Sequence, residues 1–238
     1  MSVAAVGRPS VSPGGRQYTL VRTRRRTIAV YIRAGGRVEV RAPLGATKAG
    51  IDDFVDSRSQ WIDRHAALSA ARFEQASQFA VVPGCSLLWQ GQTYPAVLQE
   101  GCRVRFDGER FLLPSRSHEE NKSAMLGLYR ETAETVLRRR TIVFAESLGL
   151  SPRSVKITGA KTRWGSCSDT NALCFAWRLL LTPPACMDYV IVHELCHMRQ
   201  HNHSAAFWQE VERVLPDYRA RRALLKEYGR RIALQDWN

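Results

Sequence analysis

The most informative stretch of the chain reads His193-Glu194-Leu195-Cys196-His197, and a third histidine follows at His203. In a helix, His193 and His197 lie one turn apart on the same face, with Cβ atoms about 5–6 Å apart. This spacing lets two imidazoles bind one zinc ion with Zn–N bonds of roughly 2.0–2.1 Å. Glu194 can then take a proton from a metal-bound water without binding the metal. Because catalytic zinc sites usually have three protein ligands and a water, His203 is the nearest candidate for the third ligand.

The residues around this stretch favour a helix. Thr182 suits the N-cap, and Pro183 suits the first helical position, where its missing N–H costs nothing. From Ala185 to Arg199 the chain has no Gly or Pro, and its apolar residues recur at helical spacing. Asn202 favours a turn out of the helix, and such a turn brings His203 back toward the metal.

The third ligand has alternatives. His201 can replace His203 as a ligand, can donate a proton to the transition state, or can be an exposed surface residue, which is the simplest interpretation. A thermolysin-like site takes a glutamate from a later helix instead. Candidates of that kind rank below His203, because charged residues of the later helices are more easily explained as solvated. They are Glu210, Glu212 and Glu227.

Two other interpretations of the motif fit the sequence poorly. Metzincins have the pattern H-E-x-x-H-x-x-G-x-x-H followed by a Met-turn. Here Gln200 occupies the glycine position, and no methionine follows His203. A chance H-E-x-x-H with surface histidines is disfavoured by the third histidine and by the predicted helix start.

Length and composition predict a folded chain. Its 238 residues, 45% of them hydrophobic, suffice for one large core or two small ones. No apolar run approaches the roughly 20 residues that span a bilayer, and the N-terminus does not match a secretory signal. Residues 1–16 contain several Gly and Pro and are expected to form a flexible tail. None of the six cysteines forms a C-x-x-C pair, so we expect reduced thiols in a cytoplasmic protein and no disulfide framework.

The chain is strongly basic, with a net charge of +13. Two arginine clusters, Arg22-Thr23-Arg24-Arg25-Arg26 and Arg138-Arg139-Arg140, carry part of this charge. Such a surplus favours association with polyanions, and it fits a solvated basic surface equally well. Because no helix-turn-helix, RRM or finger signature accompanies it, the sequence predicts at most a sequence-neutral contact with DNA or RNA.

The pattern along the chain changes from strands to helices. Strand-like segments lie at residues 27–32, 37–41, 87–89, 94–98, 103–106, 110–113, 155–157 and 173–177. Gly35-Gly36 is a hairpin signal between the first two. Helical periodicity covers residues 47–73 and 118–148, the second ending at Gly149, and returns after residue 182. The chain is therefore expected to be α+β: a β-rich N-terminal half with one helix, then a helical C-terminal half with a small sheet.

The loop Lys161–Ser168 precedes the strand at residues 173–177. That strand can offer its edge to an extended peptide. Lys161 and Arg163 can bind a substrate carboxylate, a phosphate or the oxyanion of the transition state. Equally, Arg163 and Trp164 can serve to pack and orient the helix that carries His193.

Several motifs together resemble the YgjP-like metallopeptidases, bacterial zincins related to the SprT-like and WLM proteases. The C-terminal motifs are Lys161-Thr162-Arg163-Trp164-Gly165-Ser166-Cys167-Ser168, Trp177-Arg178-Leu179, Asp188–His197, Asn202-His203-Ser204, Phe207-Trp208 and Pro216-Asp217-Tyr218 with Arg221-Arg222. Weaker N-terminal ones are Arg24-Arg25-Arg26, Val40-Arg41-Ala42-Pro43, Trp61-Ile62 and Leu88–Tyr94. The resemblance covers residues 17–238. It implies one zinc ion held by His193, His197 and His203, with Glu194 as base. It also implies a β-rich domain over residues 17–115 and a zincin-like metallopeptidase domain over residues 116–238.

The expected activity is hydrolysis of peptide bonds in a protein or peptide substrate, through a metal-activated water with Glu194 as general base. Candidate donors to the transition state are Arg163, Tyr189 and His201. One alternative is a metal-dependent nucleoside triphosphate pyrophosphatase, although no phosphate loop is present. Another is a nucleic-acid-associated protein that keeps zinc for structure, which a fourth protein ligand would support. The sequence leaves the oligomeric state open.

Overall fold

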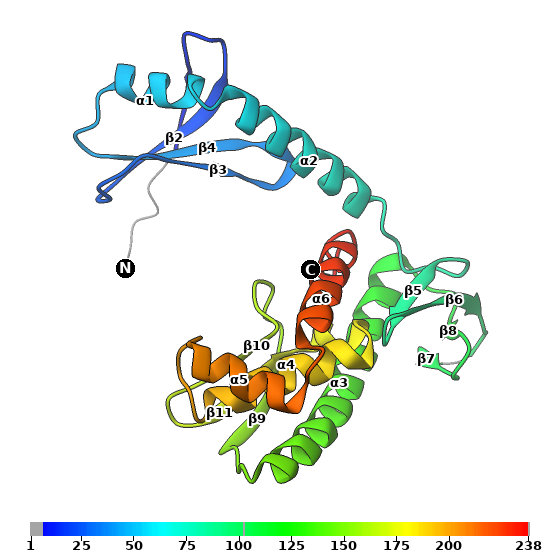
Figure 1. Ribbon diagram of the computed structural model, residues 1–238. Helices are drawn as coiled ribbons and strands as arrows, with labels where there is room; N and C mark the ends of the chain where they lie inside the picture. The colour runs from blue at the N-terminus through cyan, green and yellow to red at the C-terminus, as the bar shows by residue number, and fades with distance from the viewer. Residues whose placement is uncertain (1–6, 102, 238) are drawn as a thin grey trace. The chain divides into compact units, whose positions relative to one another are not determined.

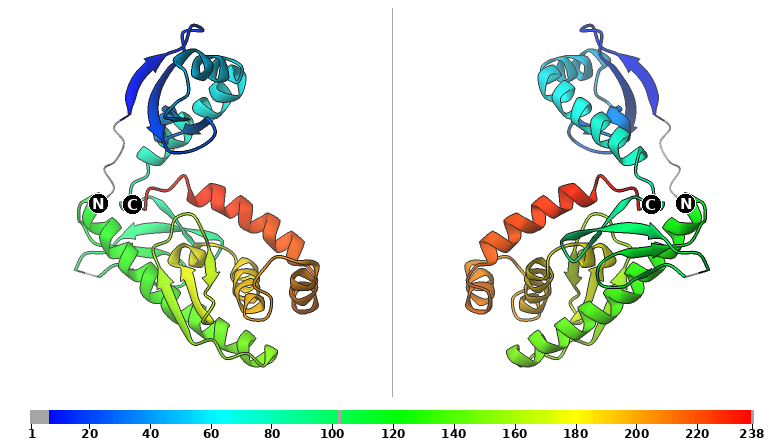
Figure 2. Two further views of the ribbon diagram at one scale, coloured as in Figure 1. Left: turned by 90° about the vertical axis from the view of Figure 1, so that its left-hand side faces the viewer. Right: turned by 90° about the vertical axis from the view of Figure 1, so that its right-hand side faces the viewer.

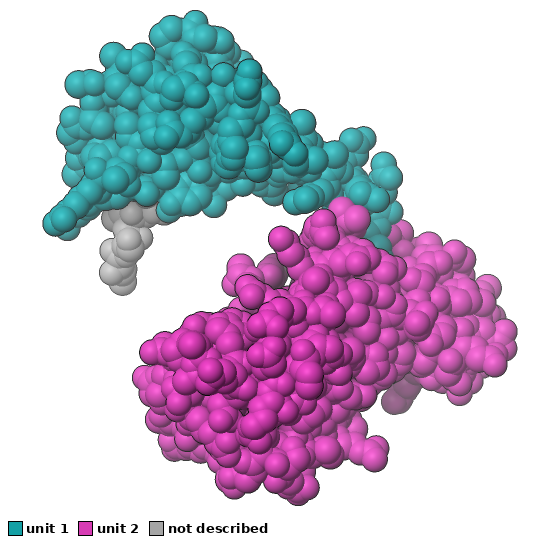
Figure 3. All heavy atoms as spheres, viewed as in Figure 1, with its two compact units in different colours: residues 1–79 teal, residues 80–238 magenta. Residues whose placement is uncertain are grey.

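The computed structural model describes residues 7–101 and 103–237, and it divides into two compact units (Figure 1; Figure 3). Unit 1 is Met1–Phe79 and unit 2 is Ala80–Asn238. Strands lie mostly in the N-terminal part of the chain and helices in the C-terminal part, so the predicted α+β class is confirmed. Among the described residues, none of the helices combines the length and the apolar character that a membrane span requires.

Unit 1 is built on a four-stranded sheet. In spatial order its strands are β1 (Arg8–Val11), β2 (Gln17–Thr23), β4 (Val38–Pro43) and β3 (Ala29–Ile32). The antiparallel strands β3 and β4 meet at Gly35 and Gly36, whose φ angles of 72° and 77° suit glycine, and the predicted hairpin is confirmed. Strand β1 pairs with β2, where the sequence analysis expected a flexible tail through residue 16. Residues 1–6 of that tail lie outside the described residues.

Two helices complete unit 1, namely α1 (Lys48–Asp56) and α2 (Ser59–Ser77). The sequence analysis expected one continuous helix over residues 47–73, and the structure divides this helical segment into two. Arg58 leaves helical geometry with φ −113° and ψ 15°. The hydroxyl of Ser57 donates to the carbonyl of Phe54 at 2.9 Å, a local bond of the kind that competes with the helical pattern. Both helices contribute to one core with the sheet, formed by Tyr18, Val40, Ala42, Ile51, Val55 and Ile62.

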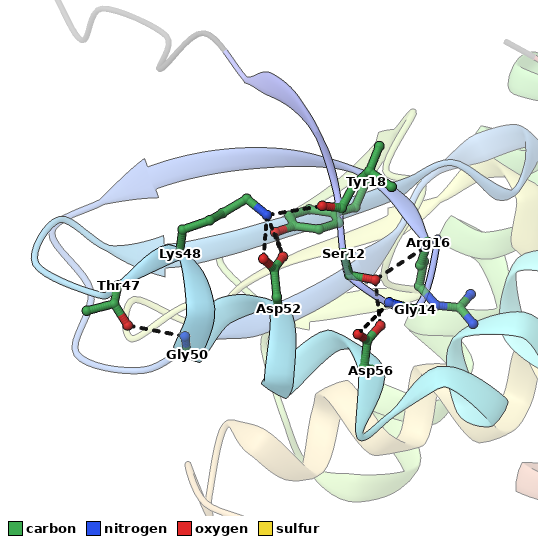
Figure 4. A network of polar contacts seen from close by, with 10 residues as sticks. Ser12, Gly14, Arg16, Tyr18, Thr47, Lys48, Gly50, Asp52 and Asp56 are labelled. Atoms are coloured by element: carbon green, nitrogen blue, oxygen red, sulfur yellow. Dashed lines mark hydrogen bonds and ion pairs between the residues drawn. The ribbon is translucent and has the colours of Figure 1, made fainter.

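A network of polar contacts anchors α1 to the first strands (Figure 4). The buried carboxylate of Asp52 accepts hydrogen bonds from the Tyr18 hydroxyl at 2.7 Å and from the Lys48 ammonium at 2.5 Å. The carboxylate of Asp56 accepts a bond from the hydroxyl of Ser12 at 2.5 Å. Since a buried carboxylate is costly without partners, these contacts fix α1 against β2 and the turn before it.

Unit 2 begins with a sheet whose spatial order is β5 (Ser86–Trp89), β6 (Gln92–Leu98), β8 (Phe111–Leu113) and β7 (Arg105–Phe106). The sequence analysis expected these strands in an N-terminal domain ending at residue 115, whereas the compact units divide between Phe79 and Ala80. Aromatic packing accounts for this division. The rings of Trp89 and Phe111 lie 5.9 and 6.2 Å from the ring of Tyr129, which belongs to the next helix.

Helix α3 (His118–Leu148) has the limits that the sequence predicted. A capping box starts it: the hydroxyl of Ser117 accepts the Glu120 N–H at 3.3 Å, and the Glu120 carboxylate accepts the Ser117 N–H at 3.1 Å. Gly149 ends it in the left-handed conformation, with φ 64°. The hydroxyl of Tyr129 donates to the carbonyl of Leu88 at 2.8 Å, so α3 also holds strand β5.

A second, three-stranded sheet follows in the order β10 (Gly165–Cys167), β11 (Ala172–Ala176) and β9 (Ser154–Thr158). Strand β10 lies within the segment that the sequence analysis took for a loop. Strand β11 pairs with β10 on one side and with β9 on the other. The expectation that residues 173–177 supply an edge for a peptide is therefore wrong, because β11 is central and β10 forms the edge.

The C-terminal elements are the short 3-10 helix η2 (Trp177–Leu181) and helices α4 (Pro184–His197), α5 (Ala205–Val214) and α6 (Tyr218–Ile232). Helix α4 contacts α3, α5, α6 and β10, so its neighbours surround it (Figure 2). Its start lies one residue later than predicted, with Pro183 as N-cap. The hydroxyl of Thr182 donates back to the carbonyl of Leu179 at 2.7 Å and caps no helix.

The cysteines that the structure describes are free thiols: Cys85, Cys167, Cys174, Cys186 and Cys196. Cys102 lies outside the described residues. Cys186 and Cys196 are buried on α4, and burial raises the pKa of each to about 11, so both remain protonated at neutral pH. These two thiols serve as small buried groups in the packing of α4.

Candidate metal centre and substrate cleft

Helix α4 brings the first two histidines together. Most of its residues are buried, Ile191, Val192 and Leu195 completely. This packing fixes the rotation of the helix about its axis. His193 and His197 project from neighbouring turns, with ring centroids 4.8 Å apart. The pair that the motif predicted is therefore present on one face.

The third histidine comes from the turn between α4 and α5. After α4 ends at His197, the side-chain oxygen of Asn202 accepts the N–H of Ser204 at 3.2 Å, and Ser204 caps α5. This turn places Nε2 of His203 at 3.1 Å from Nε2 of His193. One ring nitrogen from each of the three histidines lies within 4.8 Å of the others, so the group can hold a metal ion.

The chemistry of the three imidazoles fits zinc. Burial, reinforced by His197 and His203, lowers the pKa of His193 to about 3, so this imidazole is neutral at neutral pH. Burial also lowers the pKa of His197, whose Nδ1 donates to the carbonyl of Gln200 at 3.0 Å and leaves Nε2 free to bind. Two ligands of a tetrahedral zinc ion lie about 3.3 Å apart. The 3.1 Å between His193 and His203 is close to this value.

The rival ligands lie outside this group: His201, Glu210, Glu212 and Glu227. Glu210 pairs with Arg199 at 3.2 Å, and Glu212 pairs with Arg219 at 2.7 Å. Within residues 7–101 and 103–237, no fourth His, Cys, Asp or Glu joins the three histidines. Three protein ligands match the donor count of catalytic zinc sites, in which water takes the fourth position.

Glu194 follows His193 on α4, lines the same cleft as His193 and lies against strand β10. Glu194 is 6% exposed, and burial raises the pKa of its carboxyl group to about 7. The N–H of Cys167 and the charge of Arg163 partly oppose that rise. A Cβ atom on Gly165 would lie 2.7 Å from both Cγ and Oε1 of Glu194, so this position requires glycine. A carboxyl group with a pKa near neutrality suits proton exchange with water.

A cleft of about 420 Å³ opens at this site. Its walls come from the β10 segment, α4 and α6, and include Trp164, Tyr189, His193, Glu194, Arg222 and Lys226. Tyr189 precedes His193 by one turn, with ring centroids 5.8 Å apart. Arg222, which the sequence analysis named within a family motif but gave no role, acts electrostatically on both Tyr189 and His193. A second sequence signal is the spacing of Arg222, Leu225 and Lys226 on one face of α6.

Lys161 and Arg163 line a second cavity, of about 340 Å³. Trp164 lines both this cavity and the cleft. Neither Lys161 nor Arg163 is part of the cleft wall. Arg163 nevertheless lies near enough to Glu194 for its charge to lower the pKa of the Glu194 carboxyl group. Of the three candidate donors to the transition state, Tyr189 lines the cleft, Arg163 lies beside it, and His201 is exposed.

The two arginine clusters are partly engaged within the protein. Arg22 donates to the carbonyl of Pro43 at 2.8 Å, and Arg140 pairs with Asp188 at 2.6 Å. Other members of the clusters are exposed, namely Arg24, Arg26, Arg138 and Arg139. A sequence-neutral contact with nucleic acid stays a prediction.

One comparison with known proteins gives a family match. The family model for the YgjP-like metallopeptidase domain matches residues 26–228, which include the three histidines, Glu194 and the β10 segment. No curated protein and no solved structure matches the chain. Because the match extends over most of its length, the chain belongs to the YgjP-like metallopeptidase domain family.

Proposed function

We propose that this chain is a zinc-dependent peptidase in which His193, His197 and His203 hold the metal and Glu194 is the general base. The observation that carries the proposal is the convergence of three imidazoles, one of which, that of His193, shares a cleft wall with the buried Glu194. Membership of a metallopeptidase family supports a metal-dependent hydrolase in general. The assignment of the metal and of each residue's role is our inference from the geometry.

The chain's own groups provide the proton transfers. When bound, zinc lowers the pKa of a coordinated water toward about 7. Glu194 takes a proton from the attacking water and delivers it to the leaving amine, acting first as general base and then as general acid. The N–H of Cys167 and the close contact with Gly165 hold its carboxyl group in place for both transfers. Tyr189 is the best-placed donor to the developing oxyanion, because its ring is in the cleft wall beside His193.

Strand β10 is the element best placed to hold the substrate backbone. It forms the edge of its sheet, and its first residue, Gly165, belongs to the cleft wall. An extended peptide can add to such an edge through main-chain hydrogen bonds. A peptide in this position would run past Glu194, because the Glu194 side chain contacts Gly165.

The test compares the zinc-loaded wild-type protein with Glu194→Gln on casein and, in parallel, on nucleoside triphosphates. We expect peptides from the wild type, a loss of about 10²–10⁴-fold in the variant, and equal zinc content by mass spectrometry. Glu227→Gln is the matched control, because it makes the same chemical change at an exposed residue of α6. Normal turnover by Glu194→Gln would refute the assignment of the base. Mutant-sensitive release of pyrophosphate without peptides would indicate nucleotide hydrolysis instead.

A further inference from the structure

The second cavity adjoins the cleft along α6. Successive turns of this helix face first the cleft, with Arg222 and Lys226, and then the cavity, with Gly229 and Ile232. The indole of Trp164 stands between them and reaches the helix backbone, where a Cβ atom on Gly229 would lie 3.4 Å from Cζ2. The cleft and the cavity therefore share Trp164 as a common wall.

The cavity carries an excess of positive charge. Its wall contains Lys161, Arg163 and Arg178, and among the described residues that line it none is acidic. Arg178 is half-buried, and its hydrogen bonds go to two uncharged groups, the carbonyls of Gly159 at 3.4 Å and Trp237 at 3.1 Å. Burial lowers the pKa of its guanidinium. A carboxylate in this cavity would therefore meet three cations, one of them partly removed from water.

One acidic group near this cavity, Asp236, is paired with a cation outside it. Asp236 acts electrostatically on Arg178, which places the two residues near each other. However, the carboxylate of Asp236 forms an ion pair with Lys122 at 3.2 Å, and Asp236 is not part of the cavity wall. The apolar part of the wall, Trp164 and Ile232, can contact the methylene groups of a bound side chain.

We propose that this cavity is a subsite that binds a substrate carboxylate, so that the enzyme prefers peptides with an acidic residue, or a free C-terminal carboxylate, on one side of the cleaved bond. The proposal rests on the proposed function and names its substrate class. A peptide carboxylate fits better than a phosphate chain, because the cavity adjoins an edge strand and has no glycine-rich phosphate loop. A charge-assisted hydrogen bond in such a site changes binding by about tenfold or more.

The experiment uses alanine-based heptapeptides in which one Asp, Asn or Lys occupies each position in turn, each made with a free or an amidated C-terminus. Cleavage by the zinc-loaded wild-type protein gives kcat/KM, and fluorescein-labelled versions give Kd on Glu194→Gln, which does not consume them. The variants are Lys161→Gln and Arg178→Gln. Lys161 is exposed, so its variant remains informative even where Arg178→Gln fails to fold. Arg230→Gln is the matched control, because it removes one exposed positive charge from α6 outside the cavity wall.

We expect kcat/KM for the Asp peptide to exceed that for the Asn peptide about tenfold at one position, or kcat/KM for peptides with a free C-terminus to exceed that for amidated ones by the same factor. This ratio should fall toward one in Lys161→Gln and Arg178→Gln but not in Arg230→Gln. The first pattern identifies an acidic side chain as the ligand and the second a C-terminal carboxylate. Equal rates and equal Kd values for Asp, Asn and Lys peptides would overturn the subsite and leave the peptidase intact. Acid-selective binding without any cleavage would support the subsite and overturn the proposed function. Tighter binding of tripolyphosphate than of every acidic peptide would overturn the assignment to peptides.

Discussion

The contact between Gly165 and Glu194 leads to the sharpest prediction, the effect of Gly165→Ala. The added methyl group would lie 2.7 Å from Cγ and Oε1 of Glu194 and 3.0 Å from its Cδ. Ordinary carbon contacts are about 3.5–4.0 Å, so the carboxyl group or strand β10 must move by roughly 0.8 Å or more. Because Cγ is itself in contact, rotation of the carboxylate alone does not relieve the overlap.

This displacement sets the magnitude. A misplacement of about 1 Å costs on the order of 100-fold in rate, which corresponds to about 2.7 kcal/mol in the activation free energy. We therefore expect kcat/KM on a peptide substrate to fall about 100-fold while zinc content stays at the wild-type level, because the three atoms nearest to the added methyl group all belong to Glu194. Overpacking also lowers the free energy of unfolding by about 1–3 kcal/mol, which denaturant unfolding measures.

The control is Gly127→Ala, which adds the same methyl group on α3 at a position with no atom within 4 Å. Its kcat/KM should equal that of the wild type. If Gly165→Ala folded, bound zinc and kept kcat/KM within about threefold of wild type, the idea that β10 positions Glu194 would be refuted.

Two further predictions concern the metal and the pH dependence of stability. His203→Ala should weaken zinc binding by more than about 100-fold, because even residues that only orient ligands contribute 10–100-fold; competition with a chromogenic chelator measures this, and wild-type affinity would exclude His203 as a ligand. In the metal-free protein, the pKa of Glu194 is raised to about 7 from 4.5. Between these two pH values the carboxyl group is protonated in the folded state and ionised in the unfolded state. Wild-type stability relative to Glu194→Gln should therefore fall by about 1 kcal/mol per unit as pH rises through this window. Urea unfolding at several pH values tests it, and parallel curves for the two proteins would contradict the raised pKa.

The elements that the sequence predicted well carry strong local signals. Helix α3 has a capping box at Ser117 and a left-handed Gly149 at its end, and both depend only on neighbouring residues. The pair His193 and His197 follows from helical spacing alone. His203 required the further inference that Asn202 turns the chain back, and the structure places such a turn there. Local rules therefore suffice to predict that the three histidines converge.

The elements that the sequence missed depend on distant partners. Strand β10 is only three residues long and owes its form to pairing with β11, so no periodicity marks it. The break between α1 and α2 contains no Gly or Pro, and only the side-chain bond of Ser57 marks it. Arg222 lies on a helix with several arginines, and packing of α6 against α4 decides which of them faces the cleft.

The segment Arg163-Trp164-Gly165-Ser166 and the histidine motif, separate in sequence, form one structural unit. The sequence analysis weighed substrate binding against packing for this segment; the structure shows the packing, and substrate binding stays a prediction. Gly165 leaves room for the Glu194 side chain, and Cys167 donates its N–H to the Glu194 carboxylate. Trp164 stands between the cleft and the cationic cavity. Arg163 lines the cavity, and its charge lowers the pKa of Glu194. Glu194 is therefore held by β10 as much as by its own helix, and the motif without this strand would bring the histidines together but would leave the Glu194 carboxyl group unpositioned.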